Sequence, residues 1–362
     1  MQINQKHIMV AMSGGVDSTA AALLLKNQGA SLLGATLDLR FSCRPGESVS
    51  QQEPADLRDA RAAAQRLGIE HLSFPMGQSF RERVVQPFVE SYLCGDTPNP
   101  CVDCNLQIKF GLLLEKAREL GQDFLATGHY ARCFQHPETG RWVIARGVDV
   151  AKDQTYVLWR LTQKQLSHIL FPLGDYRKEE IRALAQEAGM GNAQKPDSQD
   201  ICFIPDGDYG RFLEEYLGRP LPEGDYLNVE GEVLGKHRGM ARYTMGQRKG
   251  LGIALGAPAY VLSKDPVRNT VTLGNEDSLY CTRFLVRNPN WIAVSSLACS
   301  TEATVKTRYT QRETKAMLHP LSNGMVLVEL SSPERAVTPG QSAVFYQDDL
   351  LLGGGFIVGA KE

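Results

Sequence analysis

The hexapeptide SGGVDS at residues 13–18 combines residue types that suit a phosphate-binding loop. Its two glycines let the backbone approach a ligand closely, and its two serines add hydroxyl donors. The apolar run HIMVAM precedes it and the helix-forming stretch TAAALLLKNQG follows it. Helix N-termini carry unpaired N–H groups and partial positive charge, so this position favours phosphate binding. The alternative is an ordinary strand-to-helix turn in which Asp17 only caps the helix.

The loop is not a Walker A motif, because no GxxxxGK[ST] pattern is present at this position. Asp17 would repel a phosphate unless a divalent cation lay between them. The aspartate is therefore a candidate contact for Mg²⁺.

Two of the eight cysteines, Cys101 and Cys104, form a CxxC motif immediately before a helix predicted over 108–121. A thiol near a helix N-terminus is expected to have a depressed pKa. Half a zinc site and a redox disulfide are the alternatives, although neither a second CxxC nor a His pair accompanies the motif. Cys202 in DSQDICFIP, judged by its Ile and Phe neighbours alone, is better interpreted as a small buried hydrophobic residue.

The elements that must position these residues alternate between strand and helix in the first half of the chain. This order predicts an α/β domain with a doubly wound parallel sheet. Strands are predicted over 7–12, 31–39, 69–74 and 123–128, and helices over 19–29, 54–68, 78–94 and 108–121. A hairpin over 131–146 and helices over 153–170 and 176–189 are expected to follow.

The second half of the chain has a different pattern. One helix near 209–218 is followed by short β-type runs, which predict a small central mixed domain. Six further runs after residue 281 predict a C-terminal antiparallel β-barrel or sandwich, and the barrel is our choice. We place the domains at 1–208, 209–280 and 281–362.

Composition limits the kind of partner that the protein can bind. The chain has 362 residues, 43% of them hydrophobic, and a net charge of −2, so nucleic acid must bind at a local basic patch. Segment 232–250 has five basic residues against one glutamate, a local charge of +4, although a solvated basic face is the alternative. Lys306, Arg308 and Arg312 around Tyr309 form a second patch.

No apolar run of membrane-spanning length and no secretory signal stand out, so a cytoplasmic protein without a membrane partner is expected. In that compartment the cysteines are expected to be free thiols, metal ligands or catalytic groups.

The loop SGGVDS resembles the pyrophosphate loop of the N-type ATP pyrophosphatases, which split ATP between its α and β phosphates and adenylate an oxygen of their substrate. Five further motifs extend the resemblance along nearly the whole chain. They are TPNPCVDCNLQIKF, ATGHYAR, KDQTYVLW, KPDSQDICFIP and YTMGQRKGLGI. In this order they resemble the bacterial tRNA-specific 2-thiouridylases.

The resemblance implies a role for individual residues of this chain. Cys104 would be the catalytic nucleophile, and Cys202 would carry sulfur as a persulfide. Contacts to ATP would come from Ala11, Met12, Ser13, Gly14, Gly15, Val16, Asp17, Ser18, Leu37 and Gly128. The target base would meet Asn99, Pro100 and Cys101, and other parts of the tRNA would meet Lys152, Asp153, Gln154, Arg308 and Tyr309.

The implied reaction is ATP-dependent 2-thiolation of the wobble uridine of tRNA, with ATP and Mg²⁺ bound by a monomer. A cysteine desulfurase or a sulfur-relay protein would donate the persulfide sulfur. Some members of the family have Asp where this chain has Cys101. Here Cys101, Cys104 and Cys202 could instead ligate three irons of a [4Fe–4S] cluster.

Two rival functions follow from the same residues. One is an ATP pyrophosphatase that adenylates a small acid, and the other is an RNA-binding module with a degenerate ATP site. The remote cysteines and the β-rich C-terminus argue against the first, and the complete loop motif argues against the second.

Overall fold

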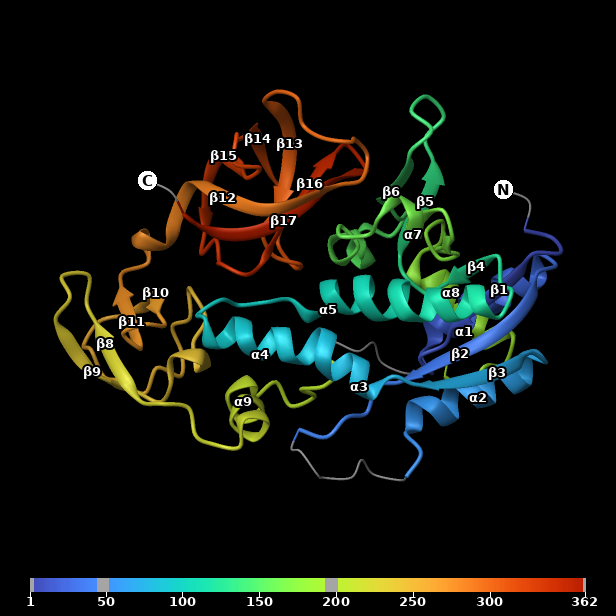
Figure 1. Ribbon diagram of the computed structural model, residues 1–362, viewed down its shortest axis with the longest axis horizontal. Coiled ribbons are helices and arrows are strands. Elements are labelled where there is room, and N and C mark those ends of the chain that lie inside the picture. Colours follow the sequence, from blue (N-terminus) through green and yellow to red (C-terminus); the bar gives the residue numbers. More distant parts are fainter. Residues whose placement is uncertain (1–2, 44–51, 193–200, 361–362) are drawn as a thin grey trace.

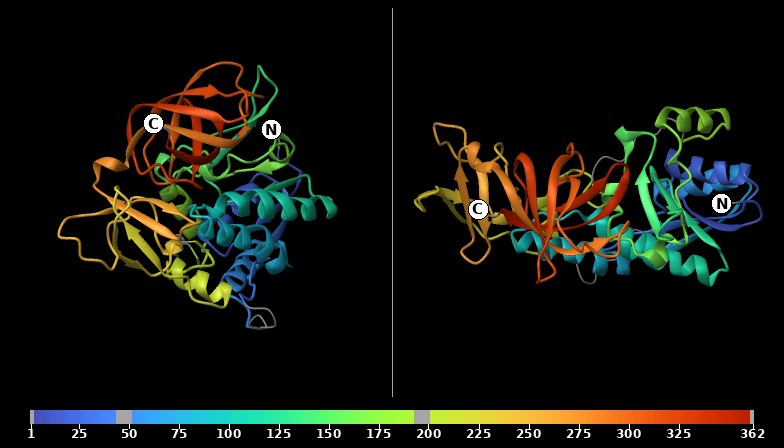
Figure 2. Two further views of the ribbon diagram at one scale, coloured as in Figure 1. Left: turned by 60° about the vertical axis from the view of Figure 1, so that its left-hand side comes forward. Right: turned by 90° about the horizontal axis from the view of Figure 1, so that it is seen from above.

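The computed structural model describes residues 3–43, 52–192 and 201–360 (Figure 1). The chain forms three regions, which the two views of Figure 2 also separate. An α/β region contains the N-terminus, a β-barrel follows at the C-terminus, and a small sheet lies between them in sequence (Figure 1).

The α/β region contains a five-stranded sheet in the order β3-β2-β1-β4-β7, and every pairing in it is parallel. Its strands are β1 His7–Ala11, β2 Ser31–Asp38, β3 Glu70–Pro75, β4 Phe124–Ala126 and β7 Ile169–Leu170. Ile8 and Val10 pack with helices α1 (Val16–Asn27) and α2 (Ala55–Leu67). Met9 packs with Phe110 and Leu113. Successive residues of a strand point to opposite faces, so both faces of the sheet are covered. The predicted doubly wound fold is confirmed.

The helix that carries the CxxC motif begins earlier than the sequence pattern indicates. It starts at α5 (Pro100–Asp103), continues through a π-helical segment η2 (Cys104–Leu113) and ends with α6 (Leu114–Glu119). Asn99 caps it, because its Oδ1 accepts a hydrogen bond from the Cys101 N–H at 3.1 Å. The CxxC motif therefore lies inside the first turns of the helix.

The helix predicted over 78–94 is present, as α3 (Gly77–Phe80), a π-helical segment η1 (Arg81–Val85) and α4 (Gln86–Leu93). Pro87 lies inside this continuous helical run without breaking it, just after the π-helical segment η1. Helix α8 (Lys178–Glu187) is also confirmed.

The continuous helix predicted over 153–170 is wrong. The chain forms two 3₁₀ turns, η3 (Val150–Lys152) and η4 (Thr155–Val157), before α7 (Gln163–Leu166) and β7. Asp153 accepts hydrogen bonds from the N–H and hydroxyl of Thr155, and Thr162 caps α7 in a capping box. These side chains satisfy backbone groups locally, which favours turns over a long helix.

The C-terminal region is a closed antiparallel barrel, as predicted. Its strands are β12 Tyr280–Trp291, β13 Thr301–Lys306, β14 Thr314–Pro320, β15 Val326–Arg335, β16 Ser342–Gln347 and β17 Leu350–Ala360. They run in the order β12-β15-β14-β13-β16-β17, and β12 closes the barrel on β17. The predicted hairpin of β5 (Ala131–Gln135) and β6 (Trp142–Arg146) joins the same sheet next to β17. This pairing attaches the barrel to the α/β region.

The middle region begins with α9 (Tyr209–Leu217) and holds a mixed sheet in the order β10-β11-β8-β9. Its strands are β8 Gly224–Leu227, β9 Val233–His237, β10 Tyr260–Asp265 and β11 Thr270–Gly274. Strand β11 is parallel to β8 and antiparallel to β10. This mixed sheet agrees with the small central domain expected from the sequence.

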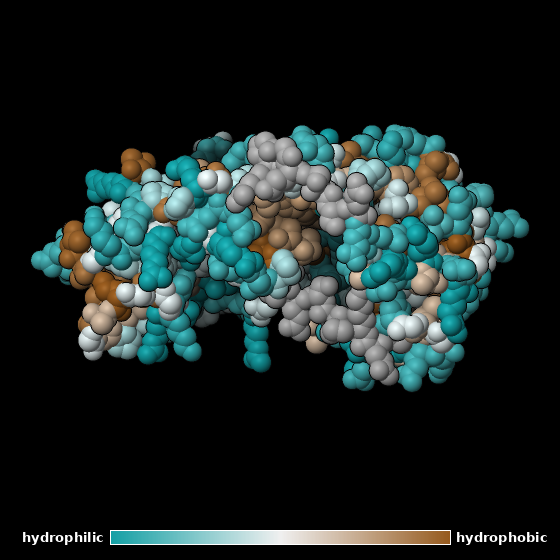
Figure 3. All heavy atoms as spheres, turned by 90° about the horizontal axis from the view of Figure 1, so that it is seen from below, coloured by the Kyte–Doolittle hydropathy of each residue, from teal (hydrophilic) through white to brown (hydrophobic). Residues whose placement is uncertain are grey.

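The face of the molecule seen from below is mostly hydrophilic, with small apolar patches toward both ends (Figure 3). Seen from below, apolar surface gathers in a hollow near the middle (Figure 3). None of the helices in the described ranges is both long and apolar enough to cross a membrane.

Candidate active site

The loop at residues 13–18 leaves the carboxyl end of β1, between that strand and helix α1. The neighbours of β1 are β2 and β4, and the chain passes to the β4 side only after it has formed β2 and β3. The loop therefore lies at the topological switch point of the sheet, where α/β proteins bind their ligands. Gly14 has φ +73°, and a Cβ there would lie 2.4 Å from the Asp56 carbonyl oxygen. Only glycine fits this position.

Hydrogen bonds within the loop hold it in one shape. The Ser18 hydroxyl accepts from the Ser13 N–H and donates to the Gly15 carbonyl, each at 3.1 Å. Thr19 donates to the same Gly15 carbonyl at 3.1 Å. Asn192 donates from Nδ2 to the Gly14 carbonyl at 3.1 Å, a contact that no sequence motif indicated. These contacts fix the shape of the loop backbone.

Asp17 is engaged by two side chains that sequence reasoning missed. Lys178 Nζ lies 2.7 and 2.8 Å from the two carboxylate oxygens, and the Tyr130 hydroxyl donates to Oδ1 at 2.8 Å. The expectation that Asp17 holds Mg²⁺ rested on an uncompensated charge. Lys178 supplies that compensation, so we assign no protein ligand to Mg²⁺.

The other residues expected at ATP lie at the same edge of the sheet. Gly128 follows β4, and a Cβ there would lie 2.8 Å from the backbone of Asp17 and Ser18. Met12 continues from β1, with its N–H bonded to the Ala35 carbonyl at 2.7 Å. Leu37 lies near the carboxyl end of β2 and is half-buried. Ala11 ends β1, and buried Val16 begins α1.

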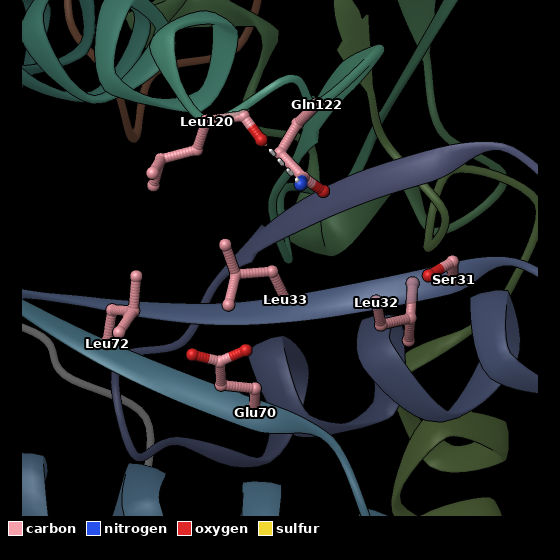
Figure 4. Close-up of a pocket in the computed structure, with 7 residues that line it drawn as sticks. All are labelled: Ser31, Leu32, Leu33, Glu70, Leu72, Leu120 and Gln122. Carbon is pink, nitrogen blue, oxygen red and sulfur yellow. Dashed lines mark hydrogen bonds between the residues drawn. The ribbon is translucent and has the colours of Figure 1, made fainter.

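One surface hollow of about 280 Å³ lies at the opposite edge of this sheet. Its lining side chains come from the amino ends of β2 and β3 and from the turn after α6 (Figure 4). They are Ser31, Leu32, Leu33, Glu70, Leu72, Leu120 and Gln122. The hollow shares no residue with the phosphate loop, so we assign it no part in the chemistry.

The three cysteines Cys101, Cys104 and Cys202 come together from two distant parts of the chain. Burial raises the pKa of Cys104 to about 12, and negative charge on Cys202 or Cys101 would raise it further. Burial also raises the pKa of Cys101 and of Cys202, although both side chains reach the surface. The prediction of a depressed thiol pKa is therefore wrong, because burial raises the pKa of each thiol by more than nearby positive charge lowers it.

Lys109 is the positive charge that opposes this effect. It lowers the pKa of each of the three thiols, although by less than burial raises it. The π-helical segment explains its position, because i and i+5 residues pair along a π-helix and Lys109 is five residues after Cys104. The sequence pattern showed no sign of this segment.

Cys202 is exposed, but its neighbour Phe203 is anchored. The Phe203 ring lies 5.3 Å from those of Phe88 and Phe212, and 5.6 Å from that of Phe80. This aromatic cluster fixes the chain beside the thiol. The first part of the KPDSQDICFIP motif, residues 195–200, lies outside the described residues.

The residues expected to meet tRNA fall into two groups. Asn99 caps the helix, Pro100 is buried and Cys101 is exposed. Asp153 is also buried, Lys152 is half-buried and precedes it, and Gln154 accepts a hydrogen bond from the Tyr130 N–H at 3.1 Å. Two of these residues, Pro100 and Asp153, thus contribute to the framework more than to the surface.

Tyr309 brings the barrel to the same place. Its ring meets that of Tyr156 edge-on at 5.9 Å, and its hydroxyl bonds with Gln154. Burial raises the pKa of Tyr309, and the charges of Asp153 and Cys101 add to the effect. The partly exposed ring of Tyr309 therefore lies close enough to Cys101 for their charges to interact.

Arg308 ties the barrel to the middle region. Its Nη2 donates to the Met245 carbonyl at 3.3 Å, the Ala336 carbonyl at 2.9 Å and the Thr338 hydroxyl at 2.8 Å. The charge of +4 expected for 232–250 is also reduced. Asp225 pairs with Lys236, and Glu214 pairs with Arg242, each at 2.7 Å. Arg248 and Lys249 remain exposed.

Within the part of the chain that the structure describes, no group of three or more His, Cys, Asp or Glu side chains is placed to hold a metal ion. The three thiols thus approach one another without forming a ligand set for an iron–sulfur cluster. His129 is buried, and its Nδ1 bonds with the Thr127 hydroxyl at 2.7 Å, so we assign it no chemistry.

Three family models of known proteins match successive parts of the chain. Residues 6–206 match the family model described as tRNA methyl transferase HUP domain. Residues 210–275 match its PRC-barrel domain, and residues 281–357 match an aminomethyltransferase beta-barrel domain.

Full-length relatives carry a more specific name. The chain is 45% identical over 360 residues to the tRNA-specific 2-thiouridylase MnmA 2 of Thermoanaerobacter sp. (strain X514), covering 99% of each chain. It is 46% identical over 352 residues to the tRNA-specific 2-thiouridylase MnmA of Moorella thermoacetica, covering 96% of this chain and 98% of the relative.

Proposed function

We propose, from the premise that this chain belongs to the tRNA-specific 2-thiouridylase family, that it is a tRNA sulfurtransferase that uses ATP to thiolate tRNA. The observation that carries the proposal is the pairing of two sites. A glycine-rich loop fixed by its own hydrogen bonds lies at the switch point of the sheet, and three thiols lie close enough for their charges to interact, with Tyr309 near Cys101. The family descriptions name methyl transfer, but that reaction would not use the thiols of Cys101, Cys104 and Cys202.

The first step we propose is activation of the C2 carbonyl of the wobble uridine. A carbonyl oxygen is a poor leaving group, so the uridine oxygen attacks the α-phosphate of ATP and pyrophosphate leaves. The N–H groups at the start of α1 and the serine hydroxyls of the loop would hold the departing pyrophosphate. Mg²⁺ is expected to accompany ATP through the phosphates.

The second step is sulfur transfer. The terminal sulfur of a Cys202 persulfide attacks C2, and AMP leaves. Cys104 then attacks the Cys202 sulfur, which frees the thiocarbonyl and leaves a Cys104–Cys202 disulfide. A thiol reductant must reduce that disulfide before the next turnover. Lys109 supports these steps because its charge favours the thiolate of each cysteine.

Substrate placement in this proposal uses both groups of candidate residues. Asn99, Pro100 and Cys101 would meet the target base, which must leave its stack to reach the thiols. Gln154 and Tyr309 would contact nearby tRNA, and Lys152, Asp153 and Arg308 would support that surface. Residues 1–208 would form the catalytic domain, 209–280 the central tRNA-binding domain and 281–362 the barrel domain. We expect a cytoplasmic monomer that receives sulfur from a cysteine desulfurase or sulfur-relay protein.

A [4Fe–4S] cluster on Cys101, Cys104 and Cys202 is the alternative source of sulfur chemistry. The side chains do not form a metal site as they lie in the described residues, so we derive no step through a cluster. Iron and acid-labile sulfide, measured on protein purified without oxygen, decide between the two. The persulfide route requires thiolation by an iron-free sample, whereas activity that tracks about four irons per chain requires the cluster.

The experiment that tests the function itself combines the protein with ATP, a persulfide donor and a tRNA transcript. We expect thiouridine in the digested tRNA and pyrophosphate release that needs both tRNA and ATP. Release that needs a small acid in place of tRNA would indicate a different ATP pyrophosphatase. Tight tRNA binding without any pyrophosphate release would leave only an RNA-binding module.

A further inference from the structure

We propose that Lys178 is a positioning residue of the phosphate loop, which neutralises Asp17 so that the polyphosphate of ATP can enter. The inference rests on the proposed function, because it assumes that residues 13–18 bind ATP. Lys178 stands 161 positions after Asp17 and belongs to none of the motifs that point to the loop.

The ion pair has the geometry of a specific contact. One ammonium group reaches both carboxylate oxygens of Asp17, at 2.7 and 2.8 Å. The Lys178 side chain is 8% exposed and that of Asp17 is 32% exposed, so the pair lies at the inner edge of the loop. Tyr130 completes the arrangement, with its hydroxyl on Oδ1 and its ring 5.8 Å from Nζ.

Electrostatics explain why the loop needs this lysine. The N-terminus of α1 offers about half a positive charge to a phosphate. Asp17 lies in the first turn of the same helix and carries a full negative charge. Without a counter-charge the aspartate would reverse the field at the loop, and ATP would meet repulsion instead of attraction. The ammonium of Lys178 restores the positive sign.

The attachment of α8 to the rest of the domain does not depend on this ion pair. Ile181 packs against Ala20 and Leu24 of α1, and Ala185 lies in the core shared by α1 and α2. The Lys178 N–H also donates to Asp149 Oδ2 at 2.9 Å, which satisfies the start of the helix. These contacts hold α8 in place without the ammonium group of Lys178, so a purely structural role does not explain why that group pairs with Asp17.

The test measures the dissociation constant of ATP on the full chain. We expect Lys178→Met to weaken ATP binding roughly tenfold or more, because Asp17 is then uncompensated. Lys178→Arg should stay near the wild type, and Asp17→Asn/Lys178→Met should recover most of the affinity. Tyr130→Phe keeps the charge balance and should change affinity less than Lys178→Met. Lys116→Met removes an exposed pair with Glu119 and is the matched control.

Three outcomes overturn the inference. They are wild-type affinity in Lys178→Met, no recovery in the double variant, and a tenfold loss in Lys178→Arg. The last variant keeps a positive charge beside Asp17, so it decides the matter even if Lys178→Met does not fold. Failure of the wild-type chain to bind ATP would overturn the proposed function itself, and this inference with it.

Discussion

The phosphate loop and the thiol site are built in opposite ways. The loop is a run of consecutive residues whose own hydrogen bonds and glycine backbone fix its shape. The thiol site joins a π-helical segment to a residue nearly one hundred positions later, held by an aromatic cluster. A site made from local backbone needs only its own sequence, whereas a site made from side chains depends on the packing of the whole domain.

The two sites also treat charge differently. At the loop, Lys178 and Tyr130 stabilise a charged carboxylate. At the thiol site, burial raises the pKa of each cysteine. The pKa of Cys104 is raised to about 12. The loop thus carries a paired positive and negative charge, whereas burial at the thiol site disfavours the thiolate form of each cysteine.

Gly14→Ala is the largest expected effect on the loop. The residue has φ +73°, and the added Cβ would meet the Asp56 carbonyl at 2.4 Å, so the loop must move. We expect tRNA-dependent pyrophosphate release to fall about a hundredfold, as for a misplaced catalytic group. Gly121→Ala is the control, since it has φ +70° but nothing within 4 Å of the added Cβ. Equal activity of the two variants would mean that the loop is not built as described.

Phe203→Ala tests the thiol site through its anchor. The ring packs between those of Phe88 and Phe212, and its loss should let Cys202 drift from Cys104. Thiouridine formation should fall about tenfold while pyrophosphate release stays near the wild type. Phe134→Ala, at a ring that is 39% exposed, is the control. A parallel fall of both activities would show that Phe203 supports the whole domain and not the thiol.

The smallest expected effect is on stability and comes from Lys264. This residue lies where the middle region contacts the end of α4. Its Nζ donates to the Tyr243 carbonyl at 2.9 Å and lies 6.0 Å from the Tyr92 ring. Burial lowers the pKa of Lys264 from 10.5 to about 8, against an opposing effect of Asp96. Between these two pH values the unfolded chain binds a proton that the folded chain has lost. The free energy of unfolding should therefore rise with pH in this window.

Lys264→Met should remove that rise. Relative to the variant, the wild type should gain about 1–3 kcal/mol between pH 8 and pH 10.5. Denaturant unfolding at several pH values measures the difference, with Lys116→Met as the control for an exposed lysine. Parallel pH profiles for wild type and Lys264→Met would contradict the assigned shift.

What the sequence predicts follows the same division. The parallel sheet, the strand-to-helix loop at residues 13–18, the hairpin at 131–146 and the six-stranded barrel all follow from local patterns, and the structure contains each of them. The contacts of Lys178 and Asn192 with the loop were not predicted, because tertiary packing alone brings these residues to it. The predicted shift of the thiol pKa was wrong in sign because burial, which a motif does not reveal, raises the pKa by more than nearby positive charge lowers it. The prediction of a helix over 153–170 was wrong because side chains there cap short turns.

We propose that activation of the uridine at the loop and supply of sulfur by the cysteines are separate steps. Cys202→Ser separates them when pyrophosphate and thiouridine are measured in the same reaction with ATP, a persulfide donor and a tRNA transcript. We expect tRNA-dependent pyrophosphate release without any thiouridine. Thiouridine at the wild-type rate would contradict the role of Cys202.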